Sequence, residues 1–138
     1  MVSLLRKSPL LAVDIVIVFP DKSFVLIKRR NPPFEGYWAI PGGFVEYGET
    51  VEEAAIREAE EETGLKVELL KLVGVYSKPD RDPRGHVVSI AFLAKPIGGE
   101  LRISSETEDV KLFKQIPSNV AFDHAEILKD ALRILGFV

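Results

Sequence analysis

Three glutamates, Glu58, Glu61 and Glu62, are the residues whose types and spacing best suit chemistry. Spacings of three and four positions place them on one side of a helix. At about 100° per residue, that side also carries the small apolar residues Ala54 and Ala55. Carboxylates grouped beside a buried face repel one another and lose hydration, which is costly unless a cation compensates them. The pattern favours a cation site, and the alternative is an acidic helix that faces solvent.

The residues around these glutamates indicate the kind of cation. The chain has no cysteine and two histidines, so a metal would be held mainly by carboxylate and carbonyl oxygens, which favour Mg2+ or Mn2+. Gly42 and Gly43, in a loop expected to open at Pro41, allow the backbone to approach a metal or phosphate closely. Arg57 is expected to pair with Glu49 and fix the loop against the helix; the alternative is a plain surface arginine.

A helix at about Val51–Thr63 must position the acidic groups. Thr50 is suited to cap its N-terminus, and Glu53 completes a capping box. Gly64 is suited to end the helix in a left-handed conformation. The local signals therefore predict both ends of this helix.

The other elements indicate an α/β fold. Strands are expected at Leu10–Phe19, Phe24–Arg29, Tyr37–Ile40, Val67–Tyr76, Val87–Ala94 and Val110–Lys114, and a second helix at Ala125–Leu135. This order does not alternate as in a doubly wound parallel sheet, and it favours an α/β sandwich. With no repeat or long linker, residues 1–138 are expected to form a single domain.

Composition restricts the class of partner. The formal net charge of −3 gives no broad attraction to nucleic acid. The apolar run Leu10–Phe19 contains Asp14 and is too short to span a bilayer. The absence of cysteine is compatible with a reducing cytoplasm. We therefore expect a cytoplasmic protein that binds a small molecule, and neither nucleic acid nor a membrane.

The segment from Gly43 to Leu65 resembles the Nudix box. It reads Gly43-x5-Glu49-x7-Arg57-Glu58-Ala59-x-Glu61-Glu62-x-Gly64-Leu65, and it matches G-x5-E-x7-R-E-U-x-E-E-x-G-U, with U apolar, at every fixed position. The resemblance implies a Nudix-type α/β/α sandwich with a mixed β-sheet over nearly the whole chain. It also implies Mg2+-dependent hydrolysis of a pyrophosphate bond in nucleoside diphosphate derivatives. Family members are often homodimers.

The resemblance also implies roles for the box residues. Glu58 and Glu62 resemble the principal metal ligands of the family. Glu61 would assist them, and the backbone carbonyl of Gly42 would complete the metal shell. These four residues are the expected metal site, with Glu61 also counted among the catalytic residues.

The other expected catalytic groups flank this metal site. Arg57 and Glu49 resemble the structural pair that lies behind the metal ligands. The general base of Nudix enzymes often comes from a loop before a late strand, here Ser104–Asp109. Glu106 is the first choice for this base and Glu108 is the second; the alternative for both is that they are solvated loop acids.

Substrate choice depends on residues outside the box. The polar segment Lys78–His86 has two prolines, which stiffen it, and Arg81 and Arg84 suit phosphate binding. Pro79, about fifteen residues after the box, resembles the marker of ADP-ribose pyrophosphatases in this family, as does the string Tyr-Ser-x-Pro-x-Arg-Asp-Pro-Arg-x-His. The resemblance implies that ADP-ribose is cut to AMP and ribose 5-phosphate; otherwise this segment is an ordinary stiff surface turn.

Further candidates lie at other positions in the chain. Arginines before the glycine pair are candidates to reach substrate phosphates, and nearby aromatic residues are candidates to stack on a base, although such residues more often belong to the core or surface. These candidates are Arg29, Arg30, Phe34, Tyr37 and Trp38, with Gly43 at the phosphate. Asp123 is expected to cap the last helix, and His124 is expected to be structural rather than catalytic.

Two other functions remain open. The first is a housecleaning hydrolase of oxidised or ordinary nucleoside triphosphates, or of dinucleoside polyphosphates. The second is a Nudix-like sensor that binds a nucleotide without cutting it. Because the chain retains every acidic residue of the box, an enzyme is favoured over a sensor.

Overall fold

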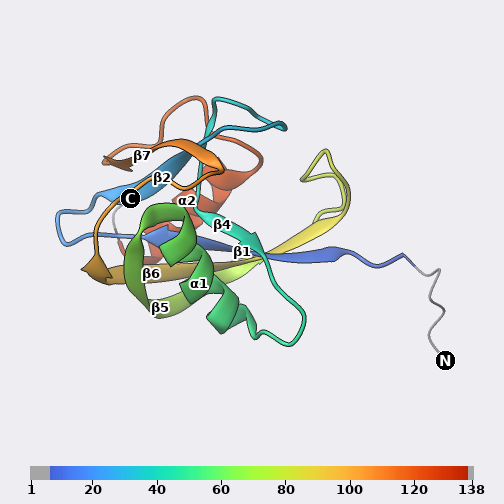
Figure 1. Cartoon of the computed structure of the whole chain (residues 1–138), viewed down its shortest axis with the longest axis horizontal. Helices are drawn as coiled ribbons and strands as arrows, with labels where there is room; N and C mark the ends of the chain where they lie inside the picture. Colours follow the sequence, from blue (N-terminus) through green and yellow to red (C-terminus); the bar gives the residue numbers. More distant parts are fainter. Residues whose placement is uncertain (1–6, 137–138) are drawn as a thin grey trace.

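Two β-sheets lie between two helices in the structure, a computed structural model that describes residues 7–136 (Figure 1). The elements are, in chain order, β1 (Leu10–Ile17), β2 (Phe24–Arg29), β3 (Trp38–Ala39), β4 (Gly42–Phe44), α1 (Val51–Thr63), β5 (Leu65–Tyr76), β6 (Val87–Gly99), β7 (Thr107–Phe113) and α2 (His124–Ile134). One sheet has the order β4-β1-β6-β5 and the other β3-β2-β7. Only the β1–β6 pair is parallel among the paired strands of the described residues, so the larger sheet is mixed, as predicted.

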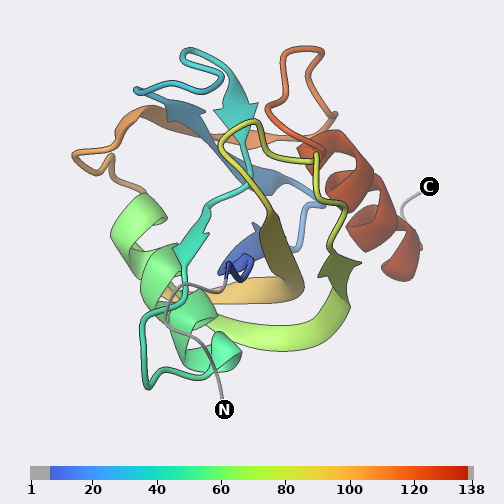
Figure 2. The ribbon, with the colours of Figure 1, turned by 90° about the vertical axis from the view of Figure 1, so that its right-hand side faces the viewer.

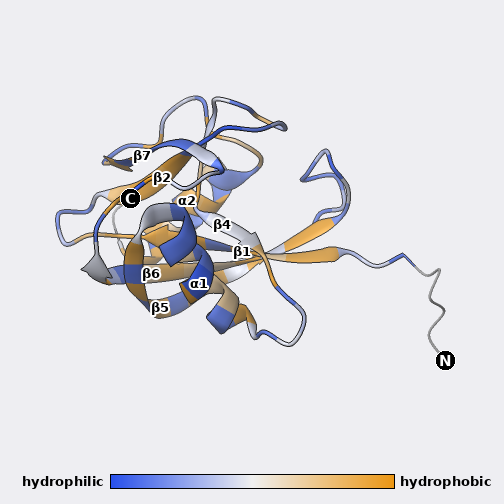
Figure 3. Ribbon diagram, viewed as in Figure 1, coloured by the Kyte–Doolittle hydropathy of each residue, from blue (hydrophilic) through white to orange (hydrophobic). Residues whose placement is uncertain are grey.

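The parallel pair β1–β6 forms the centre of the larger sheet. Its register runs from Leu10 opposite Val87 to Ile17 opposite Ala94. The inner part of β1 is buried without alternation, which is the pattern of a strand covered on both faces. Figure 3 shows hydrophobic residues concentrated along these strands and hydrophilic residues on α1 and the loops. The core therefore lies around the strands that also carry part of the site.

Helix α1 has the predicted boundaries and caps. The hydroxyl of Thr50 accepts a hydrogen bond from the backbone N–H of Glu53, whose side chain accepts one from the backbone N–H of Thr50. Gly64 ends the helix with a φ of 82°. The buried side of α1 carries three alanines and Thr63 and packs against β1, β4 and β5. The helix is therefore fixed at both ends, and the edge that carries Glu58 lies beside β4.

Helix α2 packs against β5, and the two helices flank the strands on opposite sides (Figure 2). Asp123 occupies the N-cap position of α2, but its side chain makes no capping hydrogen bond. The carboxylate binds the guanidinium of Arg81 instead, so the predicted capping role is wrong. Within residues 7–136, none of the helices has the length and apolar character needed to cross a membrane.

Several strands differ from the predicted ranges. The residues Gly42–Phe44, expected to lie in a loop, form β4 by pairing antiparallel with β1. β5 begins two residues earlier than predicted, at Leu65, and β6 continues to Gly99. β7 begins at Thr107, within the segment assigned to a loop. Each difference arises because strand pairing, which is non-local, extends the ordered backbone beyond the apolar run.

Candidate active site

A cavity of about 490 Å³ receives residues from both sheets, from α1 and from the segments before β6 and α2. Its volume falls within the range of small-molecule sites. Three groups of lining residues matter for its chemistry. We name them the acidic cluster (Glu58, Glu62, Glu106), the Arg–Phe cluster (Arg29, Arg84, Phe44, Phe122) and the polar trio (Asp14, Ser89, His124).

The acidic cluster holds carboxylates where their charge is disfavoured. Burial, with repulsion from Glu58 and Glu106, raises the pKa of Glu62 from 4.5 to about 7. Burial also raises the pKa of Glu58, although hydrogen bonding to Arg57 opposes the shift. Ser104 donates a hydrogen bond of 3.3 Å to Glu62. The cluster therefore concentrates more negative charge than its protein partners offset.

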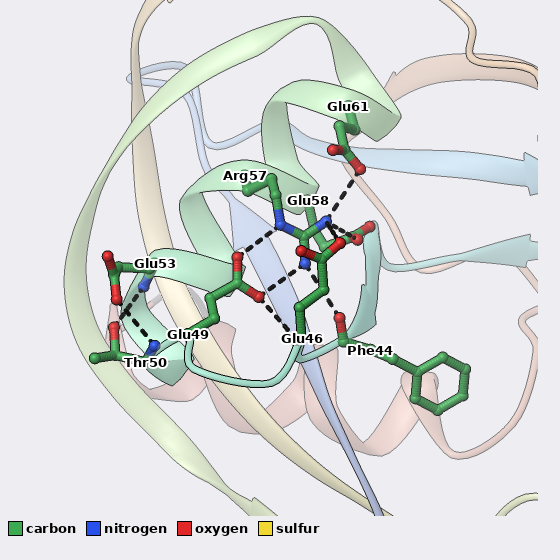
Figure 4. Close-up of polar contacts among 8 residues, drawn as sticks. All are labelled: Phe44, Glu46, Glu49, Thr50, Glu53, Arg57, Glu58 and Glu61. Carbon is green, nitrogen blue, oxygen red and sulfur yellow. Dashed lines mark hydrogen bonds and ion pairs between the residues drawn. The ribbon is translucent and has the colours of Figure 1, made fainter.

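Arg57 connects α1 to the loop before it (Figure 4). Its Nε and Nη2 atoms donate to the two carboxylate oxygens of Glu49 at 2.7 and 2.9 Å, and Nη2 also donates to the backbone carbonyl of Phe44 at 3.2 Å. Hydrogen bonds from Arg57 lower the pKa of Glu49 to about 2. Nη1 donates to Glu58 at 2.6 Å and to Glu61 at 3.2 Å. The predicted Arg57–Glu49 pair is therefore present, and it extends directly to Glu58.

The two glycines of β4 allow close packing at the cavity. A Cβ atom at Gly43 would overlap the carboxylate of Glu58. A Cβ atom at Gly42 would overlap the backbone carbonyl of Val13 and lie 2.7 Å from Oδ1 of Asp14. β4 therefore places Glu58 of the acidic cluster and Asp14 of the polar trio next to successive residues of one short strand.

The acidic cluster fits a divalent cation by the chemistry of its donors. Glu58 and Glu62 offer carboxylate oxygens of the type that Mg2+ and Mn2+ prefer. A bound cation would also offset the repulsion that raises the pKa of Glu62. Within residues 7–136, no three carboxylate or imidazole groups already converge at coordination spacing, so binding would have to draw these side chains together.

The Arg–Phe cluster brings two guanidinium groups to one aromatic ring. The guanidinium carbons of Arg29 and Arg84 lie 5.1 and 5.5 Å from the ring centroid of Phe122, and that of Arg84 lies 5.6 Å from the ring of Phe44. Arg84 donates to both carboxylate oxygens of buried Asp82, at 3.1 and 2.8 Å. Burial and the nearby charge of Arg84 lower the pKa of Arg29. This arrangement presents cations suited to phosphate beside an aromatic surface suited to a base or sugar.

The polar trio is buried in the cavity wall. Ser89 donates a hydrogen bond to Oδ2 of Asp14, and the backbone N–H of Ile40 donates to Nδ1 of His124 at 3.0 Å. Burial lowers the pKa of His124, which keeps the imidazole neutral. His124 thus supports the backbone beside β4, in agreement with its predicted structural role.

The cavity brings together about half of the residues predicted for the site. Those that line it are Arg29, Gly42, Gly43, Glu58, Glu62, Arg81, Arg84 and Glu106. Those that do not line it are Arg30, Phe34, Tyr37, Trp38, Glu49, Arg57, Glu61, Pro79 and Glu108. Of these, Arg57 still acts on the site by donating a hydrogen bond to Glu58, and Glu49 holds Arg57, whereas the side chain of Glu61 is 59% exposed at the edge of the site.

Specific contacts explain why other candidates lie elsewhere. Trp38 packs edge-on against Phe113, with ring centroids 4.8 Å apart, and lies partly buried against the core. Phe34 packs against Phe122 from outside the cavity. Glu108 faces Lys28 at 4.0 Å, so of the two candidate bases only Glu106 reaches the cavity.

Three further candidates, Arg30, Pro79 and Arg81, are also held outside the cavity or away from its open space. Arg30 donates to the backbone carbonyl of Thr107 at 3.2 Å, and Pro79 is exposed in the turn after β5. Arg81 lines the cavity but is 6% exposed, because it is tied to Asp123.

The lining residues that sequence reasoning did not assign to the site include Asp14, Phe44, Asp82, Ser89 and Phe122. For Asp14 a signal was available, because a charged residue inside an apolar strand is unusual unless it has partners. Asp82 also had a weak signal, since it stands between two arginines in a polar segment. Ser89 and Phe122 reach the cavity only through the packing of β6 and α2, which the sequence does not reveal locally.

Comparisons with known proteins agree with this geometry. The ADP-ribose pyrophosphatase of Methanocaldococcus jannaschii is 53% identical over 127 residues, covering 91% of this chain and 74% of that protein. The NUDIX domain of Shewanella oneidensis NrtR, in a crystal structure with ADP ribose, has a TM-score of 0.80 at 29% identity, covering 94% of this chain and 90% of that one.

A third relative is the bifunctional NMN adenylyltransferase/ADP ribose pyrophosphatase of Francisella tularensis, whose crystal structure contains AMP and a manganese ion. It has a TM-score of 0.79 at 28% identity, covering 94% of this chain and 43% of that one. The family model of the NUDIX domain matches residues 8–131. Together with the 53% identical relative, this match confirms the resemblance seen in Gly43–Leu65, and the chain belongs to the NUDIX domain family.

Proposed function

We propose that the protein hydrolyses the pyrophosphate bond of ADP-ribose, giving AMP and ribose 5-phosphate. The observation that carries this proposal is that the acidic cluster and the Arg–Phe cluster line the same cavity. An acidic site for a divalent cation therefore adjoins guanidinium groups suited to a diphosphate. The 53% identical relative named as an ADP-ribose pyrophosphatase and the NrtR domain bound to ADP ribose support this choice of substrate.

The Arg–Phe cluster binds the substrate in this proposal. Arg29 and Arg84 offset the negative charge of the phosphates, and the ring of Phe122 beside them offers an apolar surface. Asp82 holds Arg84 in place through its two hydrogen bonds. Substrate binding thus depends on guanidinium groups that are oriented before the substrate arrives.

The acidic cluster carries out the chemical step. A water molecule attacks one phosphorus atom, Glu106 accepts the proton of this water, and the bond from that phosphorus to the bridging oxygen breaks. The bridging oxygen leaves with the other phosphate. Arg57 keeps Glu58 oriented through the 2.6 Å hydrogen bond, and Glu49 keeps Arg57 in place.

Mg2+ is the proposed physiological cation, with Mn2+ able to replace it. Glu58, Glu62 and the backbone carbonyl of Gly42 would hold it, with Glu61 assisting from the exposed edge. When bound, such a cation neutralises phosphate charge and lowers the pKa of an attacking water. The donor chemistry of the cluster and the manganese ion in the Francisella relative support this assignment.

A substrate panel with saturating Mg2+ tests the proposed reaction. The panel contains ADP-ribose, NADH, diadenosine polyphosphates and oxidised dGTP, with product analysis by chromatography. We expect the highest kcat/KM for ADP-ribose, with AMP formed and no inorganic pyrophosphate released. Release of pyrophosphate from a triphosphate at higher kcat/KM would favour the housecleaning function. Binding of ADP-ribose without turnover would favour a sensor.

The proposal extends to the whole protein. We propose that residues 1–138 act as one domain in the cytoplasm, with a small nucleotide as partner and with a second copy of the chain in a homodimer. The match of the family model to residues 8–131 supports the single domain. The side chains of Leu70, Leu72 and Val75 on the edge strand β5 are about half exposed, which supports an interface between copies.

A further inference from the structure

The polar trio has hydrogen-bonding capacity that the proposed hydrolysis does not use. Asp14, Ser89 and His124 are 7%, 1% and 5% exposed, and all three line the cavity. Ser89 occupies Oδ2 of Asp14 by donating a hydrogen bond to it. The other carboxylate oxygen, Oδ1, faces Nε2 of His124 at 3.5 Å. This distance is longer than an ordinary N–H to O hydrogen bond of about 2.7–3.2 Å.

The backbone assigns the proton on His124. Because the N–H of Ile40 donates to Nδ1, this nitrogen must be the acceptor of the ring. The proton of the neutral imidazole is therefore on Nε2, which points toward Asp14 as a donor. Among the described residues, no side-chain nitrogen or oxygen is both sealed from solvent and without a hydrogen-bond partner. The acceptor Oδ1 and the donor Nε2 are thus reached from the cavity.

Gly42 keeps the space beside this pair open. A Cβ atom at this position would lie 2.7 Å from Oδ1 of Asp14 and would crowd it. The next residue, Gly43, adjoins the carboxylate of Glu58. A group bound at Asp14 and His124 therefore lies beside the strand that also borders the acidic cluster, where the pyrophosphate is proposed to react.

We propose that Oδ1 of Asp14 and Nε2 of His124 bind one ribose hydroxyl of the substrate. The hydroxyl donates to Asp14 and accepts from His124, because it combines a donor and an acceptor on one atom. A phosphate oxygen would be repelled by the carboxylate, and a methylene would leave both buried groups without a partner. The site therefore selects ribose over deoxyribose in the substrate. This inference rests on the proposed function, because it assigns a role within the hydrolysis of ADP-ribose.

Single-hydroxyl analogues test the inference on the unmodified protein. The kcat/KM for ADP-ribose is compared with that for analogues that each lack one hydroxyl of the adenosine ribose or of the terminal ribose. We expect one analogue to lose about 10–100-fold, mainly through KM, because a hydrogen bond to a charged group is lost. The analogue affected identifies which ribose binds at the site. Equal kcat/KM values throughout the series would overturn the inference while leaving the proposed function intact.

A second comparison separates the two failures. If ADP-ribose is not hydrolysed, the proposed function fails, and calorimetric binding of ADP-ribose and of the same single-hydroxyl analogues still decides the ribose site. About tenfold or more weaker binding of one analogue supports it, and equal affinities throughout the series overturn it.

The variant Asp14→Asn shows whether Asp14 causes the selectivity. The ratio of kcat/KM between ADP-ribose and the affected analogue should fall from about 10–100 toward one, whereas a structural defect would lower both values together. Asp21→Asn is the matched control, because this turn carboxylate is 57% exposed and outside the cavity, and it should retain the full ratio. A full ratio in Asp14→Asn would also overturn the inference. If that variant does not fold, the analogue series on the unmodified protein decides.

Discussion

Glu62 occupies an environment that disfavours its own charge. Its pKa is raised to about 7 by burial and by the neighbouring carboxylates of Glu58 and Glu106. Between pH 4.5 and 7 the folded protein therefore retains a proton on Glu62 that the unfolded chain has already released. The free energy of unfolding contributed by this group is largest below pH 4.5 and falls as the pH rises to 7. A site built for a cation thus lowers the stability of the cation-free protein.

Glu62→Gln should stabilise the metal-free protein at alkaline pH. Glutamine cannot ionise, so the loss of stability that accompanies ionisation of Glu62 is removed, and the gain is up to ~3 kcal/mol at pH 8. At pH 4.5 the difference between the two proteins should nearly vanish. Urea unfolding of both proteins in the presence of EDTA, at pH 4.5 and at pH 8, measures this difference in the free energy of unfolding. The same difference at pH 4.5 and pH 8 would show that Glu62 ionises normally.

Glu58→Gln and Glu62→Gln should each lower turnover of ADP-ribose by orders of magnitude, at least ~100-fold, while the protein stays folded. Both changes remove a charged oxygen from the acidic cluster but keep the size of the side chain. Glu52→Gln is the control, because Glu52 lies on the same helix and is exposed. Initial rates at saturating Mg2+, with circular dichroism to verify folding, measure the effect. Near-normal turnover in either variant would contradict a role as metal ligand.

At the scale of elements, α1 determines where the acidic cluster lies, and its C-terminal glycine fixes the start of β5. Gly64 has a φ of 82° and, in addition, no room for a side chain, because a Cβ atom would overlap the backbone carbonyl of Glu100. Gly48, in the loop before α1, has a φ of 85° but nothing within 4 Å of its Cβ position. Alanine substitutions at these two glycines therefore separate the free-energy cost of a left-handed backbone from the cost of steric overlap.

Gly64→Ala should destabilise the protein more than Gly48→Ala. The left-handed backbone alone costs an alanine about 1–2 kcal/mol, and we expect this cost for Gly48→Ala. Gly64→Ala should cost at least ~1 kcal/mol more, because the backbone of Glu100 must also shift. Denaturant unfolding of both variants at one pH measures the difference. Equal losses would show that the contact with Glu100 relaxes without cost.

The contrast between α1 and the other elements explains how much the sequence could predict. The caps of α1 involve residues within a few positions of one another, so Thr50 and Gly64 predicted its ends correctly. The conversion of Gly42–Phe44 into β4 depends on pairing with β1, about thirty residues earlier, and no local signal indicates it. The prediction of the site also succeeded where contacts are local in the sequence and failed where they are not.

Within the site, the division between local and non-local contacts is equally clear. Glu58 and Glu62 were found because helical periodicity places them on one edge of α1. Phe122 was missed because its ring reaches the cavity from a backbone with a φ of 52°, a conformation that a phenylalanine adopts only when its surroundings impose it. Trp38 was assigned to the substrate by residue type alone, and its packing against Phe113 places it at the edge of the core, outside the cavity.

At the scale of the whole molecule, the cavity depends on segments that are far apart in the chain. The segment before β6 carries Arg81 and Asp82 and reaches the start of α2, where Nε and Nη2 of Arg81 donate to the carboxylate of Asp123 at 2.9 and 2.6 Å. Figure 2 shows this loop, in yellow-green, rising from the larger sheet toward α2. Burial disfavours the charge of Arg81, but its bonds to Asp123 outweigh this and raise the pKa of Arg81. This pair therefore joins the Arg–Phe cluster to the rest of the fold.

A double-mutant cycle on Arg81→Met and Asp123→Asn should give a coupling free energy of about 1–3 kcal/mol. The geometry is bidentate, and the two side chains are only 6% and 21% exposed. Arg133 and Asp130 form the control pair, at 3.2 Å with side chains 67% and 34% exposed, and should give less than ~1 kcal/mol. Unfolding free energies of the four proteins in each cycle provide both values.

Arg81→Met should also raise the KM for ADP-ribose, because the adjacent Asp82 then holds Arg84 in a less fixed loop. Equal coupling in the two cycles, with KM unchanged, would show that the loop keeps its place without the Arg81–Asp123 pair.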